Sequence, residues 1–270
     1  MKVHDKGYTA ASIVQFRKLH EADKILFLGN AWDTASAIAL EKAGFAAIGT
    51  TSCGIARAWG MRDGEEIAFE RQVSIVRDIV EHVNIPVSAD IEAGYASAYG
   101  DIVDNVLRIA DAGASGLNIE DSPKTEGGLR SNAEQAHLLS QLRHALDTRG
   151  FGGFFLNART DTYLTSGISA PLEETLLRLH AYAESGADGI FVPGLSASDE
   201  IAAVVAASPI PLNVMSLPEL TSAAELQRLG VRRFSFGNAL ADLTLAFLQQ
   251  SADNLYRFQH TADLYENLPN

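Results

Sequence analysis

The sequence predicts a (β/α)8 barrel (a TIM barrel) from three observations. Short apolar runs alternate with segments of helical spacing, and glycine follows several of the helical segments. Polar and charged residues stand directly after the apolar runs, at the positions where a barrel carries its active site. The length of 270 residues suits one such domain. We therefore expect residues 1–270 to form a single barrel domain.

The glycines mark the points where helices end. Each follows a helical segment and precedes a short apolar run, as in Ala43-Gly44-Phe45 and Ser185-Gly186-Ala187, and the same pattern recurs at Gly113 and Gly230. Glycine supplies the left-handed conformation that commonly follows the last helical residue. These four places are therefore predicted junctions between a helix and the next strand.

The apolar runs have the length and composition of parallel strands covered on both faces. They are Ile25–Leu28, Ala46–Gly49, Pro86–Ala89, Gly116–Ile119, Phe154–Ala158, Gly189–Val192, Pro211–Val214 and Arg233–Phe236. Helical spacing between them is clearest over Glu65–Glu81 and Leu172–Ser185. An open doubly wound sheet is the alternative, because local patterns cannot show closure, although no GxGxxG motif follows the first run.

The last stretch, 253–270, is expected to form an added C-terminal helix. It contains Leu255, Tyr256, Phe258, Leu264 and Tyr265, enough apolar residues to pack on another surface. That surface is either a neighbouring copy of the chain or its own barrel.

Charge and cysteine content limit the function. The 34 acidic and 21 basic residues give a formal net charge of -13, which repels nucleic acids and anionic membranes and leaves a small molecule as the expected partner. An anionic substrate would need a local cation or a metal ion. The single cysteine, Cys53, fits a reducing compartment, and neither a signal segment nor a membrane-spanning run is evident. We expect a cytoplasmic protein.

Three acids follow two neighbouring strands. Asp90 and Glu92 are two residues apart at the end of the third run, so they point to the same side, and Glu120 closes the fourth run. Converging carboxylates either share protons or bind a hard cation, and Mg2+ is the usual one. The alternative is that these acids cap helices or pair with Lys and Arg. The sequence favours a metal site with Mg2+, or with Mn2+ in its place.

Other strand ends carry groups that could hold an anion. Arg159 is the first charge after the fifth run and suits a bidentate clamp on a substrate carboxylate, or an ion pair with the acids. The stretch from Thr51 through Ser52 to Cys53 offers hydroxyl and backbone N–H groups, and Asn213 lies on the seventh run. Cys53 has no histidine next to it in sequence, and all seven histidines lie in or beside helical segments, so neither a nucleophile nor a histidine base is predicted.

The segment 122–130 has the composition of a lid. It is polar, contains Gly127 and Gly128, and follows Glu120 directly. A lid would exclude water and could bring Lys124 to the substrate as a cation or as an acid or base. An ordinary solvated loop is the alternative.

Over roughly residues 24–240 the order of motifs resembles the isocitrate lyase and phosphoenolpyruvate mutase superfamily. The resemblance is carried by Gly29-Asn30-Ala31-Trp32-Asp33 with Ala35-Ser36-Ala37, Gly60-Met61-Arg62-Asp63, Asp90-Ile91-Glu92-Ala93-Gly94-Tyr95, Ile119-Glu120-Asp121 and Ala158-Arg159.

This resemblance implies a barrel in which Asp90 binds Mg2+ directly and Asp63, Glu92 and Glu120 act through water. It also implies that the loop at Ser52 and Cys53 donates N–H groups to a small 2-oxo acid, that Arg159 contacts the same end, and that the reaction passes through an enolate stabilised by the metal. Dimers or tetramers that exchange their last helix are implied as well.

The departures from the family decide the expected reaction. The lyases carry a cysteine in the lid, whereas Lys124 is followed here by Thr125, Glu126 and Gly127. The mutase has an asparagine at the position of Glu126, where a carboxylate would repel a phosphonate, and its strand-six histidine is replaced by Pro193.

We therefore expect a carbon–carbon lyase or decarboxylase for a small 2-oxo or 2-hydroxy dicarboxylate, with Lys124 or Glu126 handling the proton. A phosphorus–carbon mutase or hydrolase acting on phosphonopyruvate or phosphoenolpyruvate is one alternative. A binding barrel without catalysis is the other.

Overall fold

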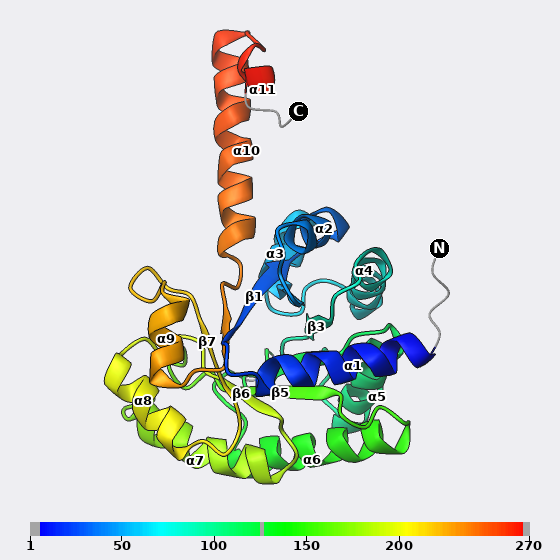
Figure 1. Ribbon diagram of the computed structural model, residues 1–270, viewed down its shortest axis with the longest axis vertical. Coiled ribbons are helices and arrows are strands. Elements are labelled where there is room, and N and C mark those ends of the chain that lie inside the picture. Colours follow the sequence, from blue (N-terminus) through cyan, green and yellow to red (C-terminus); the bar gives the residue numbers. More distant parts are fainter. Residues whose placement is uncertain (1–5, 125–126, 267–270) are drawn as a thin grey trace.

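The computed structural model describes residues 6–124 and 127–266 and contains a closed parallel barrel (Figure 1). The strands are β1 Leu26–Ala31, β2 Ile48–Thr50, β3 Val87–Asp90, β4 Gly116–Glu120, β5 Phe155–Arg159, β6 Gly189–Phe191, β7 Leu212–Met215 and β8 Arg233–Ser235. They pair in chain order, and β8 closes on β1. The prediction of a (β/α)8 barrel is confirmed. Strands β3, β4 and β5 end one residue later than the apolar runs, because their last residues are the polar Asp90, Glu120 and Arg159.

Helices surround the barrel between the strands. They are α2 Thr34–Lys42, α3 Ser52–Ala58, α4 Phe69–His82, α5 Tyr99–Asp111, α6 Asn132–Thr148, α7 Pro171–Glu184, α8 Ser198–Ala207 and α9 Ala223–Leu229. The predicted helix over Glu65–Glu81 was wrong at its start, because Glu65 has a φ of 64° and helix α4 begins only at Phe69. Helix α3, which follows β2 directly, was not predicted.

The four predicted helix-to-strand junctions are confirmed. Gly44, Gly113, Gly186 and Gly230 have φ angles of 94°, 96°, 95° and 94°. These angles lie in the left-handed region, which costs a residue with a Cβ about 1–2 kcal/mol and glycine much less. Each glycine therefore lets the chain reverse from a helix on the outside into the next strand.

Helix α1, Lys6–Glu21, closes the N-terminal end of the barrel. It lies across the ends of the strands in Figure 1. Its Phe16 is fully buried among Leu26, Leu28, Ala47 and Phe155, which form the apolar floor of the barrel. Substrate access is therefore expected at the opposite end, where the strands finish.

The barrel interior becomes polar above this floor. Asn157 Nδ2 donates to Asn118 Oδ1 at 2.8 Å and to Asn213 Oδ1 at 3.1 Å, and Arg233 Nη2 donates to Asn118 Oδ1 at 3.2 Å. All four side chains are almost completely buried. We call Asn118, Asn157, Asn213 and Arg233 the inner polar layer. Asn213, which we predicted to bind substrate, is thus engaged inside the barrel.

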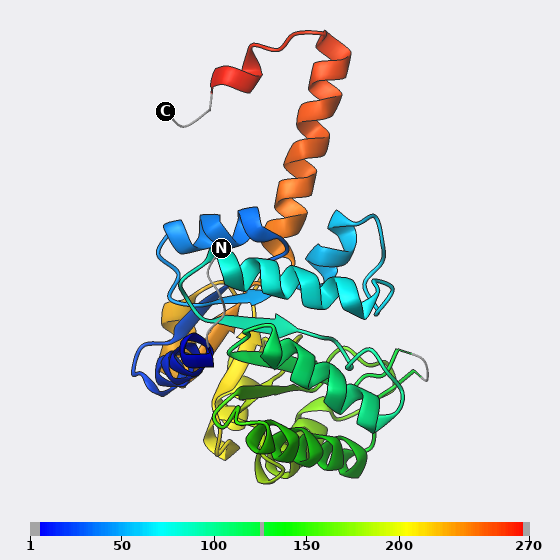
Figure 2. The same ribbon diagram turned by 90° about the vertical axis from the view of Figure 1, so that its right-hand side faces the viewer.

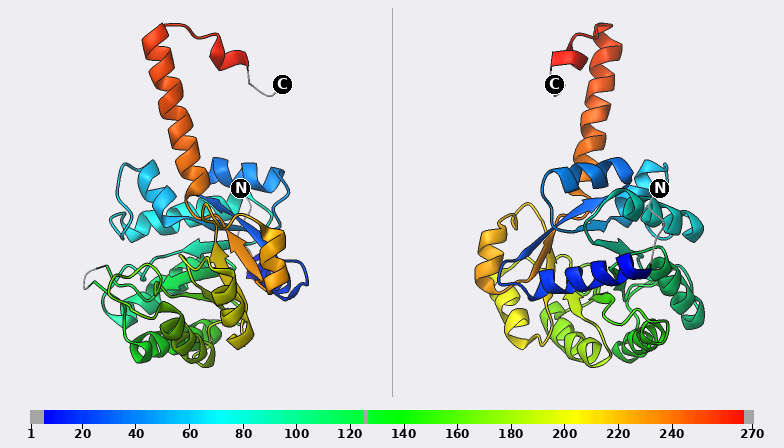
Figure 3. Two further views of the ribbon diagram at one scale, coloured as in Figure 1. Left: turned by 90° about the vertical axis from the view of Figure 1, so that its left-hand side faces the viewer. Right: turned by 45° about the vertical axis from the view of Figure 1, so that its right-hand side comes forward.

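Helix α10, Ala239–Phe258, stands away from the barrel in every view (Figures 2 and 3). It begins well before residue 253, where the sequence analysis placed the start of the extension, and a short helix α11, Asp263–Glu266, follows it. Of its residues, only Ala241 is buried. The alternative that this helix covers its own barrel is therefore wrong. In the described part of the chain, no helix combines the length and apolar character needed to cross a membrane.

Candidate active site

Asp90 ends strand β3 at the barrel mouth, where its neighbours hold it in place. Its backbone N–H donates to Thr50 Oγ1 at 2.8 Å, and its carbonyl accepts from Gln72 Nε2 at 2.8 Å. The backbone N–H of Ser52 donates to Asp90 Oδ2 at 3.2 Å. The other carboxylate oxygen, Oδ1, is buried without a partner among the described residues. One oxygen of a fixed carboxylate is therefore free to bind a ligand.

Glu92 is fixed by a loop that the sequence analysis did not connect with it. The backbone N–H of Glu65 contacts both Glu92 carboxylate oxygens at 3.0 Å, and Tyr95 Oη donates to Glu92 Oε1 at 3.0 Å. In return, Glu65 Oε1 accepts from the backbone N–H groups of Ala93 and Tyr95. Burial, reinforced by the charges of Asp63 and Asp90, raises the pKa of Glu92 to about 7.

Three residues of this region have a strained backbone conformation. Glu65, Glu92 and Tyr95 have φ angles of 64°, 50° and 59°, and the described chain has only one other non-glycine residue with a positive φ, Gln259. Such conformations cost of the order of 1–3 kcal/mol each and persist where surrounding contacts impose them. Three of them around one carboxylate are consistent with a functional site.

Glu120 lies between two cations. It is 1% exposed, and its Oε2 pairs with Arg159 Nη1 at 2.9 Å while its Oε1 contacts Lys124 Nζ. Lys124 also lies 3.5 Å from Glu92 Oε2. Burial disfavours the charge of Lys124, but attraction by Glu120 and Glu92 outweighs it and raises the pKa of Lys124 to about 12. Lys124 is therefore a cation at the mouth, as the sequence analysis allowed.

Arg159 is less free than a simple clamp would be. Its Nε and Nη2 donate to the two carboxylate oxygens of Asp161 at 2.6 and 3.1 Å. This edge is the one that would grip a substrate carboxylate with two parallel bonds. Its Nη1 pairs with Glu120 as well, so every guanidinium nitrogen of Arg159 already contacts an acid. Of the two predicted roles, the ion pair is formed, and a substrate would have to share an Nη group with one of these acids.

The loop after β2 presents Thr51, Ser52 and Cys53 beside Asp90. Thr51 Oγ1 accepts from Gly54 N at 3.3 Å and caps helix α3. Asp63 approaches the same loop: burial and the charge of Asp90 raise its pKa, against a hydrogen bond from Ser52. Burial and the charge of Asp63 also raise the pKa of Cys53, which keeps it a thiol. That Cys53 is not a nucleophile stays a prediction.

The far end of the lid segment is anchored by a buried network. Asp121 is fully buried and accepts from Arg178 Nη1 at 3.0 Å, from Tyr182 Oη at 2.8 Å and from the backbone of Asp161 at 3.0 Å. Arg178 Nη1 also donates to the carbonyl of Arg130, the last residue of the lid segment. This network ties the lid to the ends of β4 and β5.

The near end of the lid is joined to the same site. Ser122 Oγ donates to Glu120 Oε1 at 2.9 Å and to Asp161 Oδ2 at 2.5 Å. A cavity of about 430 Å³ lies beside this segment, with Tyr95, Tyr99, Lys124 and Arg130 among its lining residues. Asp90 and Arg159 are not among its lining residues, whereas Lys124 is. The cavity therefore lies next to the barrel mouth and is not the mouth itself. The predicted catalytic Glu126 lies outside the described residues.

The histidine prediction holds for the part of the chain that the structure describes. His20, His82, His137, His144 and His180 lie in helices, and His260 follows helix α10. The remaining one, His4, falls outside the described residues. A histidine base is therefore not placed at the barrel mouth by any of the six.

The donor set fits Mg2+ with one direct protein ligand. Within residues 6–124 and 127–266, no three His, Cys, Asp or Glu side chains lie close enough together to hold a metal ion between them. The simplest expectation, a cage of Asp90, Glu92 and Glu120, is thus not formed. The partnerless Asp90 Oδ1, with further carboxylates around it, suits an ion that keeps most of its waters, as Mg2+ does.

Four residues of this site were missed by the sequence analysis. Asp161 could have been found, because it stands two residues after Arg159 and so shares its side of the chain. Arg233 carried a signal too, a charge inside the eighth apolar run. Tyr95 was noted only within the motif that carries the family resemblance. Glu65 gave no signal, because its contacts depend on loop conformation.

Comparisons with known proteins identify the family of the chain. The family model for phosphoenolpyruvate phosphomutase matches residues 16–256. The chain belongs to the isocitrate lyase and phosphoenolpyruvate mutase superfamily. Its members are Mg2+-dependent lyases and mutases that act on oxo acids, and the chain is accordingly an enzyme of this superfamily.

Individual members of the superfamily show how far the similarity extends. The uncharacterized protein Rv1998c of Mycobacterium tuberculosis (strain ATCC 25618 / H37Rv) is 34% identical over 83% of this chain and 82% of its own length. The 2,3-dimethylmalate lyase of Eubacterium barkeri is 30% identical over 69% of this chain and 65% of its own length. A candidate phosphonomutase of Burkholderia cenocepacia J2315 is 37% identical, with a TM-score of 0.85 over 90% of this chain and 99% of its own.

A more distant member shows the fold with ligands. A phosphonopyruvate hydrolase crystallised with oxalate and Mg2+ has 24% identity and a TM-score of 0.85, over 96% of this chain and 92% of its own. At this identity the likeness is one of fold.

Proposed function

We propose that this enzyme is a Mg2+-dependent lyase or decarboxylase that breaks a carbon–carbon bond of a small 2-oxo or 2-hydroxy dicarboxylate. One observation carries the proposal: Asp90 presents a buried carboxylate oxygen that has no partner among the described residues, in a mouth that also holds the cations Arg159 and Lys124. A chelating oxo acid needs both a metal and positive charge for its carboxylates. The single cysteine fits work in the reducing cytoplasm.

In this proposal Asp90 holds Mg2+, or Mn2+, directly, and Asp63, Glu92 and Glu120 hold it through water. When bound, the ion supplies Lewis-acid stabilisation for negative charge that develops on the oxo oxygen of the substrate. The Ser52 and Cys53 loop orients the substrate carboxylate, and Arg159 contacts it through an Nη group that it shares with Glu120. For a 2-hydroxy acid, the hydroxyl proton passes to a carboxylate of the site as the new carbonyl forms, whereas a 2-oxo acid loses no such proton. In both cases Lys124, a cation held over the site by Glu120, donates a proton to the carbon that keeps the electron pair of the broken carbon–carbon bond. Glu126 is the second candidate for that step.

Phosphorus–carbon chemistry is the second candidate function. It is supported by the matching family model and by the similarity to the Burkholderia protein. Against it stand Glu126, at the lid position where a phosphonate would meet a carboxylate, and Pro193 after β6. Similarity to 2,3-dimethylmalate lyase favours carbon–carbon cleavage.

Turnover of a substrate panel tests the proposal. We expect the purified enzyme with Mg2+ to cleave at least one 2-oxo or 2-hydroxy diacid, such as oxaloacetate or 2,3-dimethylmalate, and excess EDTA to abolish this activity. Released oxo acid is measured with a coupled dehydrogenase, and activity must return when Mg2+ is restored. Conversion of phosphonopyruvate alone, followed by phosphorus NMR, would favour the second function. Binding of the panel without any turnover would contradict both.

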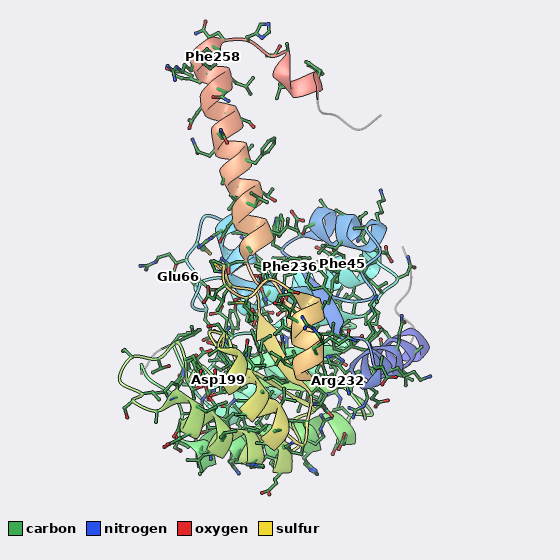
Figure 4. The ribbon with its side chains drawn as sticks, turned by 60° about the vertical axis from the view of Figure 1, so that its left-hand side comes forward. Phe45, Glu66, Asp199, Arg232, Phe236 and Phe258 are labelled. Carbon is green, nitrogen blue, oxygen red and sulfur yellow. The ribbon has the colours of Figure 1, made fainter. Side chains whose placement is uncertain are left out.

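We also propose that the projecting helix α10 packs against a second copy of the chain. Leu243, Phe247 and Leu248 on this helix are 66%, 71% and 62% exposed, more apolar surface than one helix leaves in water without a partner. Phe27 on β1, with Phe45 and Phe236, forms an aromatic cluster near its base, and Phe27 is 43% exposed. Figure 4 shows Phe45 and Phe236 together there and Phe258 at the far end of the helix.

Molar mass in solution tests this assembly. We expect light scattering to give the wild-type chain at least twice the monomer mass, and F247E to give a monomer, because a buried charge would cost several kcal/mol at such an interface. The control Q250E adds the same charge at an exposed polar position of α10 and should leave the mass unchanged. A monomeric wild type would rule out the assembly.

A further inference from the structure

Arg233 is a buried cation that the proposed chemistry does not use. It lies on β8 inside the barrel and is 2% exposed. Its Nη2 donates to Asn118 Oδ1, but Nε and Nη1 have no partner among the described residues. Its guanidinium lies 5.9 Å above the ring of Phe16 in the barrel floor. A buried arginine is normally paired with an acid, so this one requires an explanation.

The position of Arg233 connects it with the barrel mouth. Asn118, its one hydrogen-bond partner, is the register neighbour of Asp90 on the adjoining strand. Burial lowers the pKa of Arg233 to about 9, and among the described residues it is the charge of Asp90 that opposes this shift. Arg233 therefore stays a cation near neutral pH. No ion pair of described residues compensates it, so its field extends toward Asp90 and the site above.

The electrostatic balance of the mouth explains why such a cation would matter. In the described part of the chain, Lys124 and Arg159 are the cations that pair with the acids Glu92, Glu120 and Asp161, and Asp63 and Asp90 add two more acids, within a chain of net charge -13. Arg130 lies nearby, but its Nη groups donate to the backbone carbonyls of Glu120 and Ala93. This field attracts Mg2+ and repels an anionic acid. A charge placed below the site opposes that field without blocking the mouth.

We propose that Arg233 supplies a buried positive charge beneath the site, which favours binding of the anionic oxo acid and opposes binding of the metal ion alone. This inference rests on the metal and oxo acid site proposed above. Arg233 touches neither ligand and acts through its field, with Asn118 holding its side chain. Two unit charges about 10 Å apart at an effective dielectric constant of about 20 interact enough to change an affinity on the order of ten-fold.

Separate titrations of the metal and of an anion test the proposal. Mn2+ binding without anion is followed by electron paramagnetic resonance, and oxalate binding at saturating Mg2+ by calorimetry. In R233M we expect the oxalate Kd to rise about ten-fold and the Kd of Mn2+ alone to fall severalfold. R233K should stay close to wild type. The control is R232M, which removes the charge of the neighbouring Arg232 (Figure 4). The Arg232 side chain donates to the backbone carbonyl of Ala22, so R232M should change neither dissociation constant.

The two dissociation constants are expected to change in opposite directions in R233M, and this distinguishes an electrostatic role of Arg233 from a structural one. If R233M weakens both ligands, or changes neither, the proposal is overturned. Should R233M fail to fold, R233K and R233Q differ mainly in charge, and equal oxalate affinities in these two variants would also overturn it. A wild-type protein that binds neither Mn2+ nor oxalate would defeat the proposed function itself, whereas normal wild-type binding with unshifted R233M constants defeats only this inference.

Discussion

Replacing Asp90 by alanine is expected to remove Mg2+ binding and to lower kcat/KM by at least about a thousand-fold, which corresponds to roughly 4 kcal/mol of transition-state stabilisation. Asp90 Oδ1 is the one carboxylate oxygen at the mouth that is both buried and without a partner in the described chain. Its loss leaves Glu92 and Glu120, whose oxygens already pair with Glu65, Lys124 and Arg159. Calorimetric titration with Mg2+ and steady-state kinetics on the substrate found by the panel measure the two effects.

Asp78→Ala is the matched control, since Asp78 is an exposed aspartate on helix α4. It should keep both Mg2+ affinity and kcat/KM within a factor of about two, as surface substitutions usually do. A D90A variant that binds Mg2+ as tightly as wild type would show that another group holds the ion. The metal role of Asp90 would then be lost.

Replacing Arg178 by methionine is expected to lower the free energy of unfolding by about 3–5 kcal/mol. Arg178 is 5% exposed and pairs with Asp121, which has no exposed surface. The substitution leaves that carboxylate buried with only neutral donors, the hydroxyl of Tyr182 and the backbone of Asp161. Urea unfolding, followed by circular dichroism, measures the change.

A second substitution separates lost charge pairing from lost packing. Asp121→Asn in the R178M background removes the unpaired charge and should recover part of the stability, so the two effects should not be additive. Arg77→Met, an exposed arginine on helix α4, serves as the control and should cost less than about 0.5 kcal/mol. A loss below about 1 kcal/mol in R178M would mean that Asp121 finds compensation elsewhere.

The barrel could be predicted from the sequence because its signals are local. A strand covered on both faces needs a short apolar run, and the reversal out of a helix needs glycine at positions such as Gly44 and Gly186. Closure of β8 on β1 is a long-range event without a local signal. The predicted start of helix α4 was wrong for a different reason. The apolar spacing from Glu65 onward is that of a helix, but the left-handed backbone of Glu65 interrupts it.

The site was predictable in its residues and less so in its contacts. Asp90, Glu120 and Arg159 follow apolar strands, so their place at the mouth followed from the fold. Their partners did not. Arg159 was expected to offer a free edge, but Asp161 occupies it, and Glu92 is fixed by Glu65 from a loop 27 positions away. Such pairings depend on how loops cross the mouth, and a single sequence does not encode that in any local pattern.

The inner polar layer also limits how this barrel can be made more robust. Asn118, Asn157, Asn213 and Arg233 occupy positions where other barrels pack Val, Ile or Leu, and two nitrogens of Arg233 have no partner in the part of the chain that the structure describes. Aliphatic substitutions at these four positions are the first changes that selection for higher thermal stability would favour. Because the same layer sets the charge beneath Asp90, each such gain would be made at the expense of ligand affinity. Selection for thermal tolerance and selection for catalysis would therefore compete at these four positions.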